Sequence, residues 1–221
     1  MFRRSILKAA IAGAALFAIS PAFAADAKLE LNKDYQLLNP AQPGAGNGQI
    51  EVIEFFSYGC PHCAAFDPKL SKWRAAQGKD VVFRRIPVSF GRPEWAALGR
   101  LHVTLAAMGL AEKLDPLVFD AVHKSYLKLN DEPIRNDWLA KQGVDVKKFN
   151  DTWRSFGIES KMRQVDQAAE SYRVQSVPSL IIDGRYVVMD GRVQGEEKGH
   201  DRVLENATGL VAKVRAEKAK K

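Results

Sequence analysis

Two cysteines, and no others, stand within four residues of each other where an apolar strand pattern changes into a helical one. Ile50–Phe56 is a short apolar run bounded by turn residues, which is typical of a buried strand. Cys60-Pro61-His62-Cys63 follows, the apolar spacing is helical from Pro61 to about Gln77, and a second strand is predicted over residues 81–88. The order strand, helix, strand predicts a right-handed parallel crossover in an α/β fold. Because the two cysteines are so close in the sequence, a disulfide between them cannot join distant parts of the chain.

The rest of the chain divides into a helical block and a second strand region. Residues 93–172 carry helical spacing with no strand signal. Two strands are predicted over 177–182 and 185–189, joined through Asp183-Gly184, a strong hairpin dipeptide, and a last helix over 200–217. We therefore expect the two outer parts to build one sheet that a helical insertion interrupts.

Residues 1–24 have the features of an export signal. A basic start with Arg3 and Arg4 precedes the apolar run 9–19, and small residues lead to Ala24. We predict that residues 1–24 form a cleaved signal peptide. A permanent membrane anchor is the alternative, but the run is shorter than the about 20 apolar residues that span a bilayer. The two arginines also allow twin-arginine export, and either route leads to the periplasm, where disulfides persist.

The charge balance is mildly basic. The 221 residues include 33 Lys and Arg against 26 Asp and Glu, a formal charge of +7, and removal of the signal peptide lowers it to +4. Since nonspecific nucleic-acid binding depends on many cationic contacts to phosphates, this balance gives it little support, and no nucleic-acid partner is predicted.

The position of the cysteine pair predicts an acidic thiol. Pro61 at the first helical position makes Cys60 the N-cap residue. A Cys60 thiolate would face the free N–H groups of His62 and Cys63, the positive end of the helix dipole and the His62 imidazolium, all of which lower its pKa. Stabilising the thiolate favours the dithiol, so the disulfide becomes an oxidant. Cys63 is predicted to be the less exposed thiol and to attack a mixed disulfide at Cys60.

Three other uses of such a cysteine pair each have their own sequence requirements. A structural zinc site needs four ligands, and the four histidines offer no matching second pair. Covalent haem attachment needs a histidine where Ala64 stands. An inert structural disulfide remains an alternative, although it would close too small a loop to constrain the chain much. No metal ion and no organic cofactor are predicted.

Two further positions are candidates for the site. Glu54 lies in the apolar strand six residues before Cys60, where a carboxylate is neutral, paired or functional. Our hypothesis is a proton relay for Cys63; a strand-end acid that reaches solvent or a lysine is the alternative. Val177-Pro178 precedes an apolar run, and by itself this proline marks only a strand start.

These motifs together resemble the DsbA family of periplasmic thiol:disulfide oxidoreductases, within the thioredoxin-fold superfamily. The resemblance covers nearly all of the mature chain, and the Pro-His dipeptide between the cysteines is its most characteristic part. The matching segments are Glu54-Phe55-Phe56-Ser57, Cys60-Pro61-His62-Cys63, Ala106-Ala107-Met108-Gly109-Leu110, Trp153-Arg154-Ser155-Phe156, Val177-Pro178 and Asp183-Gly184.

The resemblance implies an α/β, thioredoxin-like fold with a mixed central sheet, interrupted by an inserted all-helical domain. Residues 25–90 and 166–221 would form the thioredoxin-like domain, and residues 91–165 the inserted domain, a cap beside the active-site groove. His102 within it is expected to be a packed core residue. Arg85 and Asp67 fall where the family carries other charged groups, and no role is assigned to them.

The resemblance also assigns the site residues. Cys60 and Cys63 would be the catalytic, reversible disulfide, with Cys60 attacked and facing solvent. Pro61, His62 and Glu54 would tune it, Glu54 as the family's buried acid. Pro178 would be a cis proline beside the pair, and Val177 would bind an extended substrate by strand-like backbone pairing.

The predicted function is that of a monomeric periplasmic protein dithiol oxidase. It would donate the Cys60–Cys63 disulfide to exported proteins with free thiols through a mixed disulfide at Cys60, and a membrane quinone reductase resembling DsbB would reoxidise it. A reductase or isomerase is the nearest alternative; periplasmic isomerases carry an N-terminal dimerisation domain, whereas only about 25 mature residues precede the first predicted strand at Ile50. A chaperone-like peptide-binding module is the alternative from another class.

Overall fold

The computed structural model describes residues 29–220, so the predicted signal peptide of residues 1–24 lies outside the described residues. None of the helices in this range is long and apolar enough to cross a membrane. The elements, in chain order, are β1 (Tyr35–Leu37), β2 (Ile50–Phe56), α1 (Pro61–Ala75), β3 (Val81–Pro87), α2 (Pro93–Ala107), α3 (Ala111–His123), α4 (Glu132–Lys141), α5 (Val146–Trp153), α6 (Phe156–Ser171), β4 (Ser179–Ile182), β5 (Tyr186–Val188) and α7 (Glu196–Lys218).

The sheet is mixed, and β2 lies inside it. Its strand order is β1-β5-β4-β2-β3, with β3 parallel to β2 and every other neighbouring pair antiparallel. All seven residues of β2 are buried, as expected for a buried strand, and they include two glutamates, Glu51 and Glu54. The β2–α1–β3 unit is the predicted parallel crossover, and Asp183-Gly184 joins β4 to β5 as predicted.

The expectation that Ile50 begins the first strand is wrong, because β1 precedes it. This strand has only three residues and pairs at the sheet edge, with Tyr35 opposite Val188. Two of the three β1 residues are exposed and the third is half-buried. Because such a strand needs no apolar pattern, its sequence gives no strand signal.

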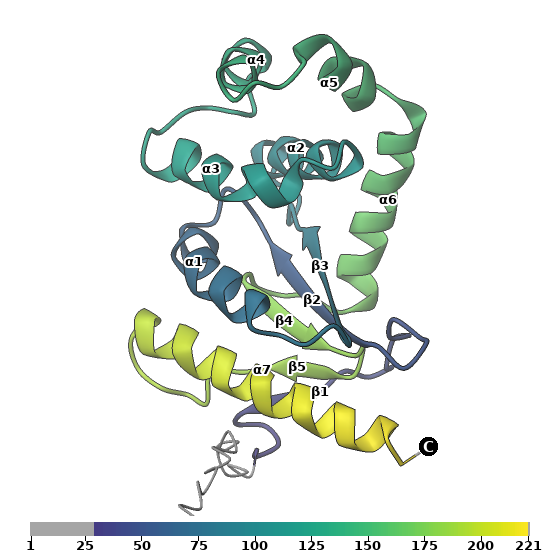
Figure 1. Ribbon diagram of the computed structural model, residues 1–221. Coiled ribbons are helices and arrows are strands. Elements are labelled where there is room, and N and C mark those ends of the chain that lie inside the picture. The colour runs from purple at the N-terminus through teal and green to yellow at the C-terminus, as the bar shows by residue number, and fades with distance from the viewer. Residues whose placement is uncertain (1–28, 221) are drawn as a thin grey trace, which may run out of the picture.

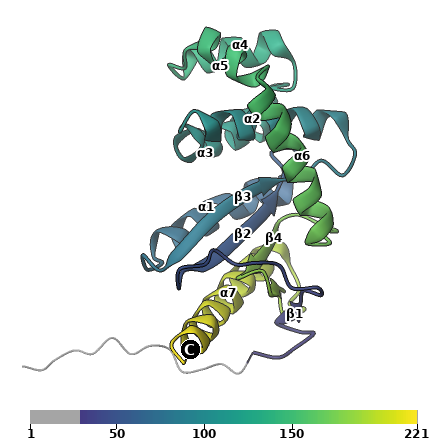
Figure 2. The ribbon, with the colours of Figure 1, turned by 90° about the vertical axis from the view of Figure 1, so that its right-hand side faces the viewer.

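Helices cover both faces of the sheet and one of its ends (Figures 1 and 2). On one face α1 and α7 bury an apolar cluster that includes Phe66, Leu70 and Leu210. On the other face α6 packs against residues that include Phe55 and Ile181. Helices α2 to α5 stack beyond the end of the sheet where β2 and β3 finish, around a third cluster to which Cys60 and Cys63 belong.

The fold is thus the predicted α/β arrangement of a mixed sheet and an inserted helical block. Three element starts differ from the expectation, that of β5 by a single residue, at Tyr186 rather than residue 185. Strand β4 begins at Ser179 rather than residue 177, because its pairing with β2 starts at Ser179 opposite Phe55 and Pro178 has no N–H to donate. Helix α7 begins at Glu196 rather than near His200. The proposed domain boundary between residues 165 and 166 falls within α6, and the division into two domains stays a prediction.

Candidate active site

The loop from β2 to α1 holds Cys60 at the start of the helix. The Ser57 carbonyl accepts a hydrogen bond from the Cys60 N–H at 3.1 Å, and Pro61 is the first residue of α1, so Cys60 is the N-cap as predicted. Gly59 is required here by a close approach, because a Cβ atom added to it would lie 2.4 Å from the indole nitrogen of Trp95.

The two cysteines are free thiols in this structure and differ in burial. Cys63 is completely buried, and Cys60 retains 4% of its surface. Cys63 is therefore the less exposed thiol, as predicted. The expectation that Cys60 faces solvent is wrong for this state, since the thiol belongs to the cluster under the helical block and donates a hydrogen bond to the Val177 carbonyl at 3.5 Å.

The two thiols also differ in acidity. A hydrogen bond from the Cys63 thiol is the largest cause that lowers the pKa of Cys60 to about 6; the backbone N–H groups of Cys63 and His62 and the charge of His62 add to it, and burial opposes them. In this structure the Cys60 side chain accepts no capping hydrogen bond from these N–H groups. The predicted stabilisation by the N–H groups therefore concerns the Cys60 thiolate and not the thiol. Burial, followed by the Cys60 anion, raises the pKa of Cys63 well above its usual range. The pair therefore ionises at Cys60.

His62 is the charged neighbour of the pair on α1. Its side chain is 63% exposed, and Nδ1 lies 2.5 Å from the Oε1 atom of Glu196 at the start of α7. The hydrogen bond to Glu196 is the main cause that raises the pKa of His62. The sequence did not identify Glu196, because an acidic residue in the first turn of a helix is common and nothing local indicates its distant partner.

The Val177–Pro178 peptide bond is cis, as the resemblance implies. Its loop lies against the cysteine pair, although 117 residues separate Cys60 from Val177. No backbone carbonyl of residues 29–220 accepts a hydrogen bond from the Val177 N–H.

Glu54 is completely buried and paired. Its Oε2 atom accepts a hydrogen bond from Nε of Arg85, the residue opposite it on β3, at 2.6 Å. Burial is the largest cause that raises the pKa of Glu54 to about 7, and Arg85 opposes this shift. The second oxygen, Oε1, has no hydrogen-bond partner among the described residues. Of the readings left open by the sequence, the strand-end acid that reaches solvent is wrong, because Glu54 is in mid-strand with neighbours on both sides.

Arg85 connects Glu54 to a buried polar network that the sequence did not reveal. Its guanidinium also pairs with Asp67 on α1 and, at 3.2 Å, with Asp115 on α3. Burial alone would lower the pKa of Arg85, but the three carboxylates raise it above its ordinary value. Tyr58 donates to Asp115, and Nδ1 of His102 lies 3.2 Å from the same carboxylate. His102 is buried, as predicted, but it belongs to this network as well as to the packing.

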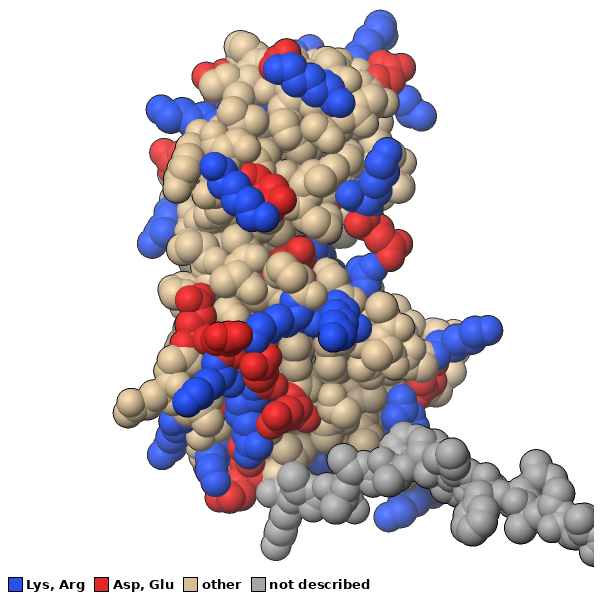
Figure 3. Space-filling view, turned by 60° about the vertical axis from the view of Figure 1, so that its left-hand side comes forward, with Lys and Arg blue, Asp and Glu red and all other residues tan. Residues whose placement is uncertain are grey.

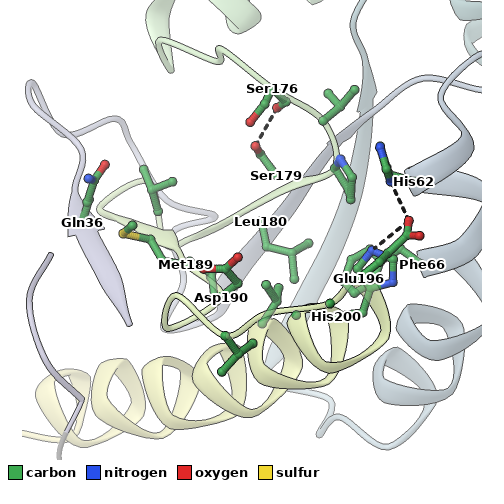
Figure 4. Close-up of a pocket in the computed structure, with 18 residues that line it drawn as sticks. Gln36, His62, Phe66, Ser176, Ser179, Leu180, Met189, Asp190, Glu196 and His200 are labelled. Atoms are coloured by element: carbon green, nitrogen blue, oxygen red, sulfur yellow. Dashed lines mark hydrogen bonds and ion pairs between the residues drawn. The ribbon is translucent and has the colours of Figure 1, made fainter. Parts of the chain in front are cut away.

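A groove of about 600 Å³ opens beside the pair, between the Val177–Pro178 loop and the start of α7 (Figure 4). Apolar side chains such as Phe66 and Leu180 line part of it, and His62 and Glu196 line it at the starts of α1 and α7. No lysine or arginine is among the described residues that line it. Within residues 29–220, no three His, Cys, Asp or Glu side chains are grouped so that they could hold a metal ion.

A dithiol at the helix start of a β–α–β crossover, with a cis proline packed on it from a hairpin strand, defines a thioredoxin-fold protein of the thiol:disulfide oxidoreductase class. Comparison with known proteins narrows the class. The model of the DSBA-like thioredoxin domain family matches residues 51–197, and this chain belongs to that family.

Related proteins match this chain in sequence and in structure over most of its length. The thiol:disulfide interchange protein DsbA of Pseudomonas syringae pv. tomato is 41% identical over 214 residues, which cover 97% of each chain. The crystal structure of Pseudomonas aeruginosa DsbA has a TM-score of 0.78 at 37% identity and covers 87% of this chain and 97% of its own. The structure of oxidoreductase DsbA from Xylella fastidiosa gives a TM-score of 0.74 at 30% identity, with 83% and 96% covered.

Proposed function

We propose that this chain is a periplasmic protein dithiol oxidase that donates a Cys60–Cys63 disulfide to newly exported proteins. The observation that carries the proposal is the asymmetry of the pair: Cys60 is the N-cap of α1 and keeps some exposed surface, whereas Cys63 is completely buried. In agreement with this geometry, the pKa of Cys60 is lowered to about 6 and that of Cys63 is raised. A stabilised Cys60 thiolate favours the reduced pair, so its disulfide has a strong tendency to take up two electrons.

The first step is attack by a substrate thiolate on Sγ of Cys60. The new bond joins the substrate sulfur to Cys60, the Cys60–Cys63 bond breaks, and Cys63 leaves with the electron pair. Cys60 is the better target because it retains some exposed surface, whereas Cys63 has none. The Cys63 thiolate then takes up a proton, since burial strongly disfavours its charged form.

The second step releases the oxidised substrate. A second substrate thiolate attacks the substrate sulfur of the mixed disulfide, and Cys60 leaves as the thiolate that His62 and the helix start stabilise. Two substrate thiols have then become one disulfide, and the enzyme holds both electrons as a dithiol. Glu54, with a pKa raised to about 7, serves as the proton relay for Cys63, because it can hold or release a proton near neutral pH.

The substrate binds beside the cis proline as an extended segment. The Val177 carbonyl lies 3.5 Å from the Cys60 sulfur, so a strand paired with this backbone would bring its own cysteine to Cys60. The apolar part of the adjoining groove fits side chains of proteins that have not finished folding. Pro61 and His62 tune the pair through the helix start.

The partners follow from this chemistry. The dithiol is reoxidised by a membrane quinone reductase resembling DsbB, and no bound metal or organic cofactor takes part. The chain acts as a monomer in the periplasm after cleavage of residues 1–24. Lys and Arg side chains are interspersed with Asp and Glu on the face that carries α1 and the start of α7, which supports a protein substrate rather than a nucleic acid (Figure 3).

The test combines an equilibrium with an activity. The pair is equilibrated with glutathione buffers, and oxidation of a dithiol peptide is followed with wild type and with Cys60→Ser. An oxidising equilibrium and loss of peptide oxidation in the variant are expected. A strongly reducing equilibrium would instead favour a reductase or isomerase, and retained biological function without oxidation would favour a peptide-binding module.

A further inference from the structure

The ion pair between His62 and Glu196 joins the active-site helix to a distant part of the chain. These residues are 134 positions apart, and their side chains face each other where both line the groove (Figure 4). Both remain accessible, with 63% and 47% of their side chains exposed. His62 is thus held by a group that is not part of the Cys-Pro-His-Cys motif.

The start of α7 places Glu196 at this position. Gly195, the N-cap residue, has a φ of +88°, a backbone conformation that favours glycine, and Glu196 is the first helical residue after it. A carboxylate is stabilised in the first turn by the helix dipole. The next residue, Glu197, has its carboxylate 3.7 Å from Nζ of Lys69 instead. Glu197 therefore provides a matched acid on the same turn that does not pair with the imidazole.

Two anionic groups act on His62, the Cys60 thiolate and the Glu196 carboxylate. Cys60 ionises on the same loop, and Glu196 faces the imidazole from α7. His200 lies 3.9 Å from Glu196, but burial lowers the pKa of His200 and favours its neutral form. Lys69 on α1 pairs with Asp201 of α7 at 2.6 Å.

We propose that Glu196 is a positioning residue for thiol exchange, which holds the His62 side chain in its protonated form beside the Cys60 sulfur. The proposal rests on the proposed function and adds to the motif a residue from the other end of the chain. Glu196 acts on the reacting sulfur through His62 and forms no bond to the substrate.

The role of Glu196 follows from a comparison of the pKa of the Cys60 thiol with that of a histidine side chain. The pKa of Cys60 is about 6, and an ordinary histidine has a pKa of 6.5. Without Glu196 the imidazole loses the main group that raises its pKa and keeps only the weaker effect of the Cys60 anion, so it gives up its proton at lower pH. With Glu196 the His62 pKa is raised, so the cation persists to higher pH than it would without this carboxylate.

The experiment compares Glu196→Gln with Glu197→Gln in the full mature chain. The pKa of His62 is measured by NMR of labelled histidine in both redox states, and the equilibrium with glutathione is measured at pH 5.5 and 7.5. In Glu196→Gln the His62 pKa should fall, and the equilibrium constant for oxidation of glutathione should fall about 1.5- to 5-fold at pH 7.5, the range of an exposed ion pair. At pH 5.5, where His62 is protonated in both proteins, the difference should vanish. Glu197→Gln should match wild type.

A second arm separates positioning from a general effect of charge. In a His62→Ala background, Glu196→Gln should cause no further change of the equilibrium. An unchanged His62 pKa in Glu196→Gln, an equal loss at both pH values, or a further loss in the His62→Ala background would each overturn the proposal. Failure of the proposed function would be seen separately, as a strongly reducing equilibrium of the wild type, and would leave the His62 pKa comparison intact.

Discussion

Replacing the buried Glu54 with glutamine should raise the free energy of unfolding at neutral and alkaline pH, but not at acidic pH. The folded protein raises the Glu54 pKa from 4.5 to about 7, mainly through burial. Between these values the folded state binds a proton that the unfolded state has released, so the contribution of Glu54 to stability is lost as pH rises from 4.5 to 7. A shift of this size corresponds to about 3 kcal/mol at pH 8. Glutamine carries no charge and avoids this loss.

The measurement is urea unfolding of the reduced protein at pH 4.5 and pH 8. Glu54→Gln should be more stable than wild type by up to about 3 kcal/mol at pH 8, while the gain becomes small at pH 4.5. Glu112→Gln, on an exposed acid that pairs with Arg74, is the control and should change stability by less than about 1 kcal/mol at either pH. A Glu54→Gln protein that is less stable at pH 8, or whose gain does not depend on pH, would refute the reasoning.

Three further outcomes are expected. Alkylation of Cys60 by iodoacetamide should reach half its maximal rate near pH 6, and a midpoint above pH 8 would contradict the lowered pKa. Gly59→Ala should cost about 1–3 kcal/mol in urea unfolding and alter tryptophan fluorescence, because the new Cβ displaces Trp95; an unchanged spectrum would argue against this contact. Arg85→Met should cost about 3–5 kcal/mol at pH 8, since it leaves three carboxylates buried without their cation. Arg163→Met, whose pair with Glu159 is exposed on both sides, should cost less than about 1 kcal/mol; equal losses would show that the buried network matters little.

The sequence alone determined the parts of this protein that depend on near neighbours in the chain. A mainly apolar run bounded by turn residues predicts a buried strand, and Pro61 after Cys60 predicts a helix start with a cysteine at its N-cap. The acidity of Cys60 follows in direction from this local geometry, because the groups that lower its pKa lie within three residues of it. The resemblance added the cis bond before Pro178, which no local pattern distinguishes from an ordinary strand start.

Only the tertiary structure decided which distant groups meet at the site. It placed Arg85 beside Glu54 through strand register and brought Asp115 from α3 to the same guanidinium. It also set Glu196 against His62 across 134 residues. A single sequence does not encode such pairings in any local pattern, since charged side chains are usually exposed and each has many possible partners. Burial and register select the partners, because a charge inside the fold must be matched by another within hydrogen-bond distance.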